Sequence, residues 1–439
     1  MNRIEAEDFV YKSYLKAEKN QLYEDRDAQK RHPELSRSLL RDMSRTPAIV
    51  ITGSKGKGSV ANMIACILQS QLKVGLMTSP HIADFCERFR INGSIIPDKD
   101  FVYHTEKIAP LFEQIDKEIP SHICISPMAI QAAIALSYFN AQQTQFNIFE
   151  CGKGAQYDDV NNVKHDYAVI NTIFLEHTRE LGSTIAQIAE DKAHVITGEQ
   201  KCVYIAEQDP SAMEVIQKRA QETHTPLKTY GKDFYSQNIR FTKKGMLFDI
   251  VVNNTTYQDI LVPLLGEHQT KNCALALAVA IDILKDINII SIKHSLEKLQ
   301  WPGRMEILCH DPFIILDACI NRASCDNVKN VLRHLGISNC CTIIGIPDDK
   351  DFSGVAHAMA EVSTEIILTK SQNPHYKFTP TQKEQLASEG LDAQWTFSIQ
   401  EALAIAKRTM QPTVILGTTS VVAEVKCFIT SVGINYRHS

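Results

Sequence analysis

The sequence has no long apolar run. No window reaches the roughly eighteen unbroken apolar residues that a membrane-spanning helix needs. The opening segment, MNRIEAEDFVYKSYLKAEKN, is charged throughout and lacks the apolar centre of a secretory signal. We therefore expect a cytoplasmic protein without membrane contact.

Long basic runs are also missing, and the formal net charge is −5. A dedicated nucleic-acid binder needs a strongly positive surface. The twelve cysteines are scattered and include no Cys-x-x-Cys pair, while Cys66, Cys273 and Cys341 lie inside apolar runs. These absences predict a protein that does not bind DNA or RNA and whose thiols are reduced and mostly buried.

The composition is that of an ordinary folded enzyme, with 44% hydrophobic and 22% charged residues. A chain of 439 residues exceeds what one hydrophobic core normally holds. Neither an internal repeat nor a low-complexity linker divides it. We predict two domains, residues 1–300 and 301–439, that lie close together with a cleft between them, in a monomer or weak dimer.

Short apolar runs alternate with segments of helical periodicity, which is typical of an α/β fold. Residues 1–45 are polar and helical in pattern, with an amphipathic helix after Pro33. Runs that are apolar on both faces predict parallel strands covered by helices on both sides. Over the first 300 residues such runs lie at 47–52, 73–78, 146–150, 167–174 and 202–206. A second α/β set, with PFIILDA, TIIGI, TEIILT and TVILG, follows WPGR (301–304).

The segment VITGSKGKGS (50–59) joins an apolar run to a helical one and has the composition of a phosphate-binding turn. Its three glycines would let backbone N–H groups approach phosphate oxygens, while the helix N-terminus and Lys57 add positive charge. The strict Walker pattern fails, because only two residues separate Gly53 from Gly56 and Ser59 comes one position late. A tight glycine turn with a solvated lysine is the alternative interpretation.

This loop and the segments after it resemble the folylpolyglutamate synthase and dihydrofolate synthase family of the Mur ligase superfamily. TGSKGKGS resembles the family's TGTNGKGS loop, and GLMTSPHIADFCERFRING (75–93) resembles its TSPH segment with the following Glu-Arg and Asn-Gly. Further matches follow in order: FECGKGAQYDDVN, LEHTRELGSTIAQIAEDKA, LLGEHQTKNCALA, WPGRMEIL, GIPDDKD and LGTTSVVAEV. The resemblance implies a P-loop ATPase domain of the Mur ligase type, with a mostly parallel sheet, and a smaller Rossmann-like C-terminal α/β domain that closes the ATP and amino-acid site.

The chemistry implied by this resemblance is ATP-dependent amide formation. A substrate carboxylate would take the γ-phosphate of ATP, and the amino group of an amino acid, with glutamate favoured, would capture the acyl phosphate. Mg²⁺ and fixed cations would neutralise the transferring phosphoryl group. The predicted catalytic residues are Lys57, His177 and Lys192. The predicted phosphate cradle consists of Gly53, Ser54, Lys55, Gly56, Lys57, Gly58 and Ser59.

The resemblance also implies metal ligands, namely Ser79, Glu150 and His177, and matches Lys192 to a lysine that the family carbamoylates. Each has a plainer interpretation when taken singly. Glu150 fits an exposed edge carboxylate, His177 a loop histidine and Lys192 a solvated helix residue. Their order after the phosphate loop favours the functional interpretation.

In the linker and the second domain, Gln269, Asn272, Arg304 and Asp317 resemble residues that contact ATP in the family. Arg304 would reach phosphate and Asp317 the ribose, although a salt bridge at the domain boundary also fits Arg304. The GIPDDKD segment supplies three charged residues for the amino-acid substrate or the domain interface: Asp349, Lys350 and Asp351.

The resemblance breaks at one segment expected near the nucleotide and at one that faces the substrate. The family's DGAHNP is DACINR here, so Ile320 replaces a histidine and Arg322 a proline. Met128 and Ala129 replace a Phe-Glu pair that faces the pterin-bearing substrate, which removes a stacking surface and a hydrogen-bond acceptor. Three hypotheses stay open at this point. They are a folate ligase, the same chemistry on a different carboxylate in a specialised pathway, and a non-catalytic nucleotide-binding partner of a ligase.

Overall fold

The computed structural model describes residues 1–19, 32–242, 244–374 and 376–431. The N-terminal region forms two helices, α1 (Arg3–Lys19) and α2 (Glu34–Met43), and α2 is the amphipathic helix predicted after Pro33. The part of the helical prediction that falls on residues 20–31 lies outside the described residues. Within the described residues, no helix combines the length and apolar character that crossing a membrane requires.

The first large layer is an eight-stranded sheet with the order β4-β3-β2-β5-β1-β6-β7-β8. All neighbours from β2 to β8 pair in parallel, and only β3 and β4 are antiparallel additions at one edge. Every strand predicted over the first 300 residues is present. The predicted strands are β1, β2, β5, β6 and β7. The full set of strands in the sheet is β1 (Ala48–Thr52), β2 (Val74–Met77), β3 (Phe89–Ile91), β4 (Ser94–Ile95), β5 (Phe146–Glu150), β6 (Tyr167–Ile170), β7 (Cys202–Ile205) and β8 (Leu227–Thr229).

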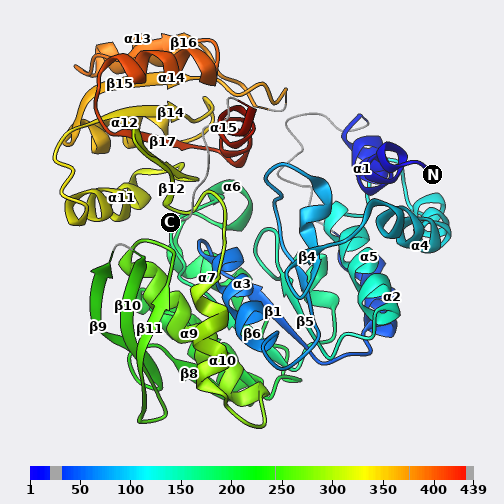
Figure 1. Ribbon diagram of the computed structural model, residues 1–439. Helices are drawn as coiled ribbons and strands as arrows, with labels where there is room; N and C mark the ends of the chain where they lie inside the picture. The colour runs from blue at the N-terminus through cyan, green and yellow to red at the C-terminus, as the bar shows by residue number, and fades with distance from the viewer. Residues whose placement is uncertain (20–31, 243, 375, 432–439) are drawn as a thin grey trace.

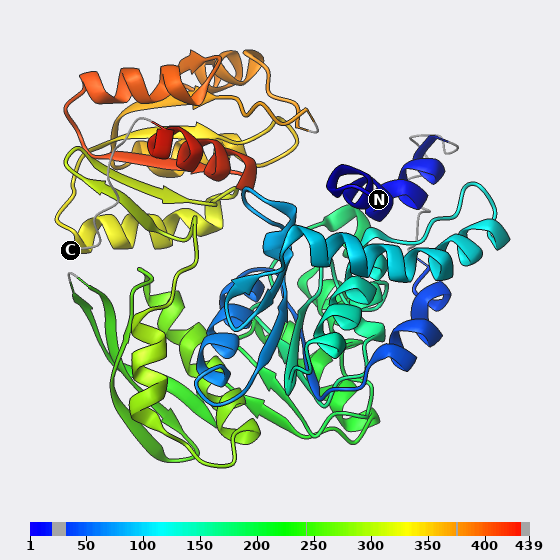
Figure 2. The ribbon, with the colours of Figure 1, turned by 45° about the vertical axis from the view of Figure 1, so that its right-hand side comes forward.

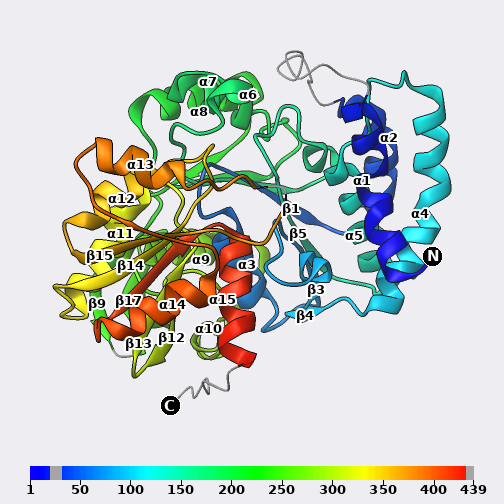
Figure 3. The same ribbon diagram turned by 90° about the horizontal axis from the view of Figure 1, so that it is seen from above.

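Helices cover both faces of this sheet, as Figures 1 and 3 show. Along β1, Ala48 and Val50 pack into one hydrophobic core, and Ile49 and Ile51 pack into the other. This alternation explains why the strands are apolar on both faces. One face carries α3 (Lys57–Leu68), α9 (Glu267–Ile283) and α10 (Ile289–Glu297). The other carries α1, α2, α4 (Asp98–Glu118), α5 (Pro127–Ala141), α7 (Ile185–Ala193) and α8 (Pro210–Glu222).

A three-stranded antiparallel sheet, which the sequence analysis missed, packs against α9 on the side away from α5 (Figure 1). It consists of β9 (Phe234–Thr242), β10 (Gly245–Val252) and β11 (Thr255–Val262). Asn253 and Asn254 join β10 to β11 with φ angles of 48° and 65°. Two consecutive positive φ angles are typical of a tight hairpin turn, and asparagine tolerates them well. The Asn-Asn pair was therefore the hairpin signal in the sequence.

The last third of the chain forms a six-stranded sheet with the order β12-β13-β17-β14-β15-β16, flanked by helices and set above the first sheet in Figures 1 and 2. The four apolar runs predicted after WPGR are four of its strands. The strands are β12 (Glu306–His310), β13 (Phe313–Asp317), β14 (Cys340–Gly345), β15 (Ser363–Thr369), β16 (Gln394–Thr396) and β17 (Thr413–Gly417). The helices are α11 (Arg322–His334), α12 (Phe352–Ala360), α13 (Thr381–Ser388), α14 (Ile399–Arg408) and α15 (Thr419–Ser431).

The two layers touch at several points. Lys55 in the phosphate loop donates to the hydroxyl of Ser324 in the first turn of α11. The rings of Phe241 and His334 stack with centroids 3.9 Å apart. All twelve cysteines are free and nine of them are buried, as the sequence predicted.

A buried histidine between α4 and α5 makes the fold sensitive to acid. His104 is 3% exposed and its Nδ1 lies 2.8 Å from Ser137 Oγ, and burial lowers the pKa of His104 to about 4. The unfolded chain, with an ordinary histidine pKa of about 6.5, therefore takes up the proton first as the pH falls. Stability from neutral His104 is complete above about pH 6.5 and is lost between there and about pH 4, amounting to at most about 3 kcal/mol.

We expect His104→Gln to flatten the fall of the melting temperature over this pH window. Thermal unfolding followed by circular dichroism from pH 7 to pH 4 measures the effect. His310→Gln, at an exposed position, should keep the wild-type profile. Equal slopes for wild type and His104→Gln would show that His104 does not contribute to the acid sensitivity.

Candidate active site

The predicted functional residues of the first layer lie at the carboxyl edge of the eight-stranded sheet. Ile51 pairs with Glu150 and Thr52 with Ile170, so Gly53, Glu150 and Asn171 lie at the ends of three adjacent strands. Ser79 follows β2, the next strand, and its backbone N–H donates to Glu150 Oε2 at 3.0 Å. The parallel arrangement thus gathers at one edge residues that are up to about 120 positions apart.

The phosphate loop needs its glycines for steric reasons. Gly53 has a φ of 137°, and Gly56 has a φ of 77° at the position that caps α3. A Cβ atom at Gly53 would lie 2.8 Å from the Cβ of Asn171, and one at Gly56 would lie 2.6 Å from Asn171 Nδ2. At Gly58 the Cβ would lie 3.3 Å from Glu150 Oε2. The loop therefore follows the ends of β5 and β6 as closely as a backbone can.

Two lysines converge on the carbonyl oxygen of Gly53. Lys57 Nζ donates to it at 2.9 Å and Lys192 Nζ at 3.0 Å. Lys192 is fully buried, which excludes the interpretation of a solvated helix residue. Burial and the charge of Lys57 lower the pKa of Lys192, and Glu176, whose Oε1 lies 3.0 Å from Lys192 Nζ, opposes the shift. The single carboxylate of Glu176 thus faces the two lysines, Lys57 and Lys192, beside the N-terminus of α3. The excess of positive charge at this helix end favours the binding of an anion.

The remaining cradle residues hold the loop to its surroundings. Ser54 Oγ donates to the carbonyl of Phe174 and accepts from its N–H, both at 3.2 Å, which fixes the segment that leads to His177. Ser59 is buried in the first turn of α3. Lys55 points instead to Ser324 of the second layer, as described above. Lys55 therefore bridges the two layers rather than contributing to the first alone.

Glu150 is buried, 4% exposed, and is not an exposed edge carboxylate. Burial raises the pKa of its carboxyl, and the positive charges of Lys57, Arg304 and Arg88 oppose that shift. Within the described ranges, no group of three or more His, Cys, Asp and Glu side chains could hold a metal ion. Mg²⁺ usually binds through one or two carboxylates together with substrate phosphates rather than in a cage made by the protein alone. A single buried carboxylate beside the phosphate loop therefore fits a Mg²⁺ ion that arrives with ATP.

His177 lies at the start of the short helix α6 (Thr178–Leu181) with a φ of 46°. Burial lowers the pKa of His177 to about 4, and Lys153 adds to this shift. The charge of Lys350, from the GIPDDKD segment of the second layer, also acts on His177. In the described part of the chain no hydrogen bond joins His177 to Ser79 or Glu150. Burial and the charges of Lys153 and Lys350 thus disfavour the protonated form of His177.

An amide chain connects α9 to the phosphate loop. Asn171 Nδ2 donates to Asn272 Oδ1 at 3.3 Å, and Asn272 Nδ2 donates to Gln269 Oε1 at 3.1 Å. The position of a Cβ at Gly56 is 3.3 Å from Asn272 Oδ1. Gln269 and Asn272, predicted from the GEHQTKN segment, thus border the loop. Asn171 was missed because the apolar run predicted at 167–174 included it, whereas the strand β6 ends at Ile170 directly before it.

The linker and the second layer contribute Arg304 and Asp317. The charge of Arg304 acts on Glu150, which places this guanidinium near the phosphate loop. Arg304 Nη1 donates to the carbonyl of Gly303 at 3.1 Å. Asp317, at the end of β13, accepts from the backbone N–H of Met305 at 2.8 Å. Ile320, three residues later, packs against the core of the second layer.

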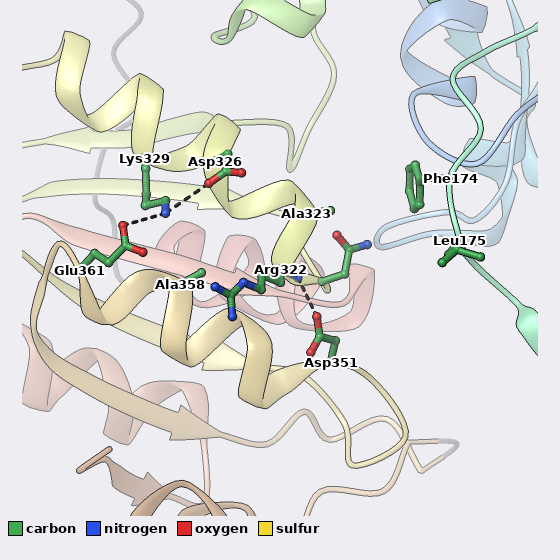
Figure 4. Close-up of a pocket in the computed structure, with 10 residues that line it drawn as sticks. Phe174, Leu175, Arg322, Ala323, Asp326, Lys329, Asp351, Ala358 and Glu361 are labelled. Atoms are coloured by element: carbon green, nitrogen blue, oxygen red, sulfur yellow. Dashed lines mark hydrogen bonds and ion pairs between the residues drawn. The ribbon is translucent and has the colours of Figure 1, made fainter. Parts of the chain in front are cut away.

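A cavity of about 570 Å³ lies between the two layers. In Figure 4, Phe174 and Leu175 face the first turn of α11 and the start of α12 across it. Arg322 lies beside Ala358, and its backbone N–H donates to Asp351 at 2.8 Å. The rest of the lining is Asn321, Ala323, Asp326, Lys329 and Glu361. The cavity adjoins His177 because Phe174 and Leu175 directly precede the Glu176-His177 pair.

Comparison with known proteins identifies the family. Residues 51–280, more than half of the chain, match the Mur ligase middle domain. The chain belongs to the Mur ligase family. This Mur ligase is 28% identical over 385 residues to the folylpolyglutamate synthase of Lacticaseibacillus casei, covering 86% of this chain and 89% of that protein.

Two solved structures share the fold over nearly the whole length. The Mycobacterium tuberculosis folylpolyglutamate synthase, solved with ADP and AMPPCP, has a TM-score of 0.83 and 25% identity over 92% of this chain and 96% of that one. A folylpolyglutamate synthase (FPGS) in an FPGS–AMPPCP–folate complex has a TM-score of 0.82 and 25% identity over 99% of this chain and 100% of that one. These similarities confirm the resemblance to the folylpolyglutamate and dihydrofolate synthases, and the chain is an ATP-dependent ligase.

Proposed function

We propose that this Mur ligase joins an amino acid, with glutamate favoured, to the carboxylate of a folate-type acid. The observation that carries the proposal is the convergence of Lys57 and Lys192 on the carbonyl oxygen of Gly53 at the N-terminus of α3. Two ammonium groups at a helix N-terminus suit the phosphates of ATP. The names of the relatives support a folate as the acid and glutamate as the amine.

In this proposal the phosphate loop holds ATP, and Lys57 moves from Gly53 to the β- and γ-phosphates. Ser79 and Glu150 hold Mg²⁺, which supplies charge neutralisation for the transferring phosphoryl group when it is bound. We propose that His177, which approaches from between the layers, also binds the metal. Arg304 approaches the phosphates and Asp317 approaches the ribose. We place the domain boundary between residues 300 and 301.

The incoming amino acid is assigned to the cavity between the layers. The acid lies at the sheet edge, so its acyl phosphate would face the cavity beyond His177. Arg322 offers a guanidinium there for a carboxylate of the amino acid, in place of the proline of the family. Asp351 holds the backbone of Arg322 and so orients the first turn of α11.

Carbamoylation of Lys192 remains a prediction from the family. Burial and the charge of Lys57 lower the pKa of Lys192, which favours the neutral amine that reacts with carbon dioxide. The ion pair with Glu176 works against that reaction, because it stabilises the ammonium. Modification would therefore require Glu176 to turn away or to be protonated.

A second candidate keeps the chemistry and changes the acid. Ala129 is fully buried and its N–H is taken by Ser126 Oγ, and the side chain of Met128 approaches Gly152. A pterin ring has neither the phenylalanine nor the glutamate of the family to contact here. A carboxylic acid with a smaller or more apolar body fits these residues better.

The experiment that tests the function is phosphate release from ATP by the purified protein with Mg²⁺, glutamate and either dihydropteroate or tetrahydrofolate. We expect release that requires both the acid and the amino acid, and a product heavier than the acid by one glutamyl residue in mass spectrometry. Turnover only with other carboxylates of a broad panel would favour the second candidate. Absence of turnover with every acid and amine in the panel would contradict both candidates.

A further inference from the structure

A buried arginine, Arg88, interacts electrostatically with Glu150 but forms no ion pair with a carboxylate in the described part of the chain. Arg88 ends the short 3-10 helix η2 (Phe85–Arg88) and is 8% exposed. Its Nε donates to His81 Nδ1 at 2.9 Å, and its Nη1 donates to Gln131 Oε1 at 2.6 Å. Within the described residues no carboxylate pairs with Arg88.

The surroundings of Arg88 are unusual for a structural arginine. Both hydrogen-bond acceptors are neutral, and the ring of Phe85 lies 4.9 Å from the guanidinium. Tyr11, Glu150 and Glu7 act on the charge of Arg88 without a hydrogen bond or ion pair to it among the described residues. Gln131 is held in place because its Nε2 donates to the carbonyl of Pro127, which keeps Oε1 directed at Arg88. Buried charges are normally paired with an opposite charge or bound to a metal. Arg88 is therefore a buried cation whose hydrogen-bond partners, among the described residues, are neutral.

The position of Arg88 indicates which anion completes the pair. His81 lies two residues after Ser79, whose N–H is bonded to Glu150, and the charge of Glu150 acts on Arg88. Glu150 in turn borders Gly58 of the phosphate loop. An acid that is phosphorylated at this loop must bring its carboxylate close to the negative charge of Glu150. Cations offset this repulsion, and Arg88 is one of them together with Lys57 and Arg304.

We propose that Arg88 binds the carboxylate of the acid that this ligase activates, with His81 and Gln131 orienting the guanidinium. The assignment rests on the proposed function only in that the substrate is a carboxylic acid, and it holds for a folate or for another acid. A guanidinium has five N–H donors, of which two are used here, so its remaining N–H groups can donate to a carboxylate. The alternative is that Arg88 only braces η2 against α5.

The test compares Arg88→Met and Arg88→Lys with the matched control Arg90→Met, which removes a nearby part-buried arginine whose Nε bonds a backbone carbonyl. We expect Arg88→Met to raise KM for dihydropteroate or tetrahydrofolate roughly 10- to 100-fold, because a charge-assisted hydrogen bond is lost. KM for ATP should change less than about twofold, and Arg88→Lys should recover part of the loss. Arg90→Met should leave all these values near those of wild type. An unchanged KM for the acid, or an equal rise for acid and ATP, overturns the assignment.

Thermal unfolding of the ligand-free protein supplies a readout that needs no substrate. Arg88→Met removes a buried charge that has no bonded carboxylate, which favours the folded state, but it also leaves Gln131 Oε1 and His81 Nδ1 without their donor. If Arg88 is an anion site, these effects should nearly cancel and the melting temperature should stay near that of wild type, whereas removing a structural brace should lower it by several degrees. A clear fall in melting temperature therefore contradicts the proposal even if no acid is turned over. An unchanged or raised melting temperature together with inactive wild-type protein would count against the proposed function and support the role of Arg88 as an unfilled anion site.

Discussion

Replacing Lys57 by alanine is expected to lower ATP turnover in the presence of acid and amino acid by at least about a hundredfold. A preorganised charge aimed at a transferring phosphoryl group typically contributes this much or more to kcat. Lys57 Nζ already lies 2.9 Å from the carbonyl of Gly53, inside the loop, so a small movement brings it to a bound phosphate. Lys192, the other cation at this carbonyl, is buried and paired with Glu176, and it cannot replace Lys57.

Steady-state phosphate release at saturating acid and amino acid measures this effect. The control is Lys73→Ala, since Lys73 lies beyond the end of α3 and its Nζ donates to the carbonyl of Gln142 on the surface. We expect the control to retain wild-type turnover. Lys57→Ala activity within about tenfold of wild type would show that the loop does not hold the triphosphate. Crystals soaked with AMPPCP would show the same thing directly if the loop stayed empty.

Gly53→Ala is expected to lower both stability and ATP turnover. At a φ of 137° a residue with a side chain is strained, by about 1–3 kcal/mol. The added methyl group would also lie 2.8 Å from Asn171 Cβ and 2.9 Å from Asn171 O, so β6 or the loop must shift. Because Asn171 is bonded to Asn272, a shift at this point disturbs the nucleotide side of the site as well.

The matched control for this prediction is Gly231→Ala. Gly231 has a φ of 86° and nothing within 4 Å of the position of its Cβ, so the variant carries backbone strain without the clash. We expect Gly53→Ala to lower the melting temperature by several degrees more than Gly231→Ala and to raise KM for ATP, whereas Gly231→Ala should leave KM for ATP unchanged. Equal melting temperatures for the two variants would mean that the loop relaxes freely, which would contradict a tight contact between Gly53 and Asn171.

Much of the fold follows from local patterns. Each strand predicted over the first 300 residues is a short apolar run. Because these strands are buried on both faces, each can be predicted from its own residues alone. Strand β11 was hard to predict because it is largely exposed and its apolar pattern is interrupted. Strand β10, GMLFDIVV, is a mostly buried apolar run that the sequence analysis missed, and the Asn-Asn turn after it was a second signal. The tight glycine turn at residues 53–58 was readable from glycine spacing, since Gly53 and Gly56 have positive φ angles that few other residues adopt, and its role in binding phosphate stays a prediction.

What the sequence by itself determined is the family, the phosphate loop and the order of the segments that follow it, because those depend on residue types at short spacings. Only the tertiary structure decided which charges meet. The contact of Lys192 with the carbonyl of Gly53 joins residues 139 positions apart, and that of Lys55 with Ser324 joins residues 269 positions apart. The neutral partners of Arg88 also come from outside its own element, because Gln131 is 43 positions away. Such contacts arise from how strands order themselves in a sheet and how the second layer closes on the first, and no spacing along the chain encodes them.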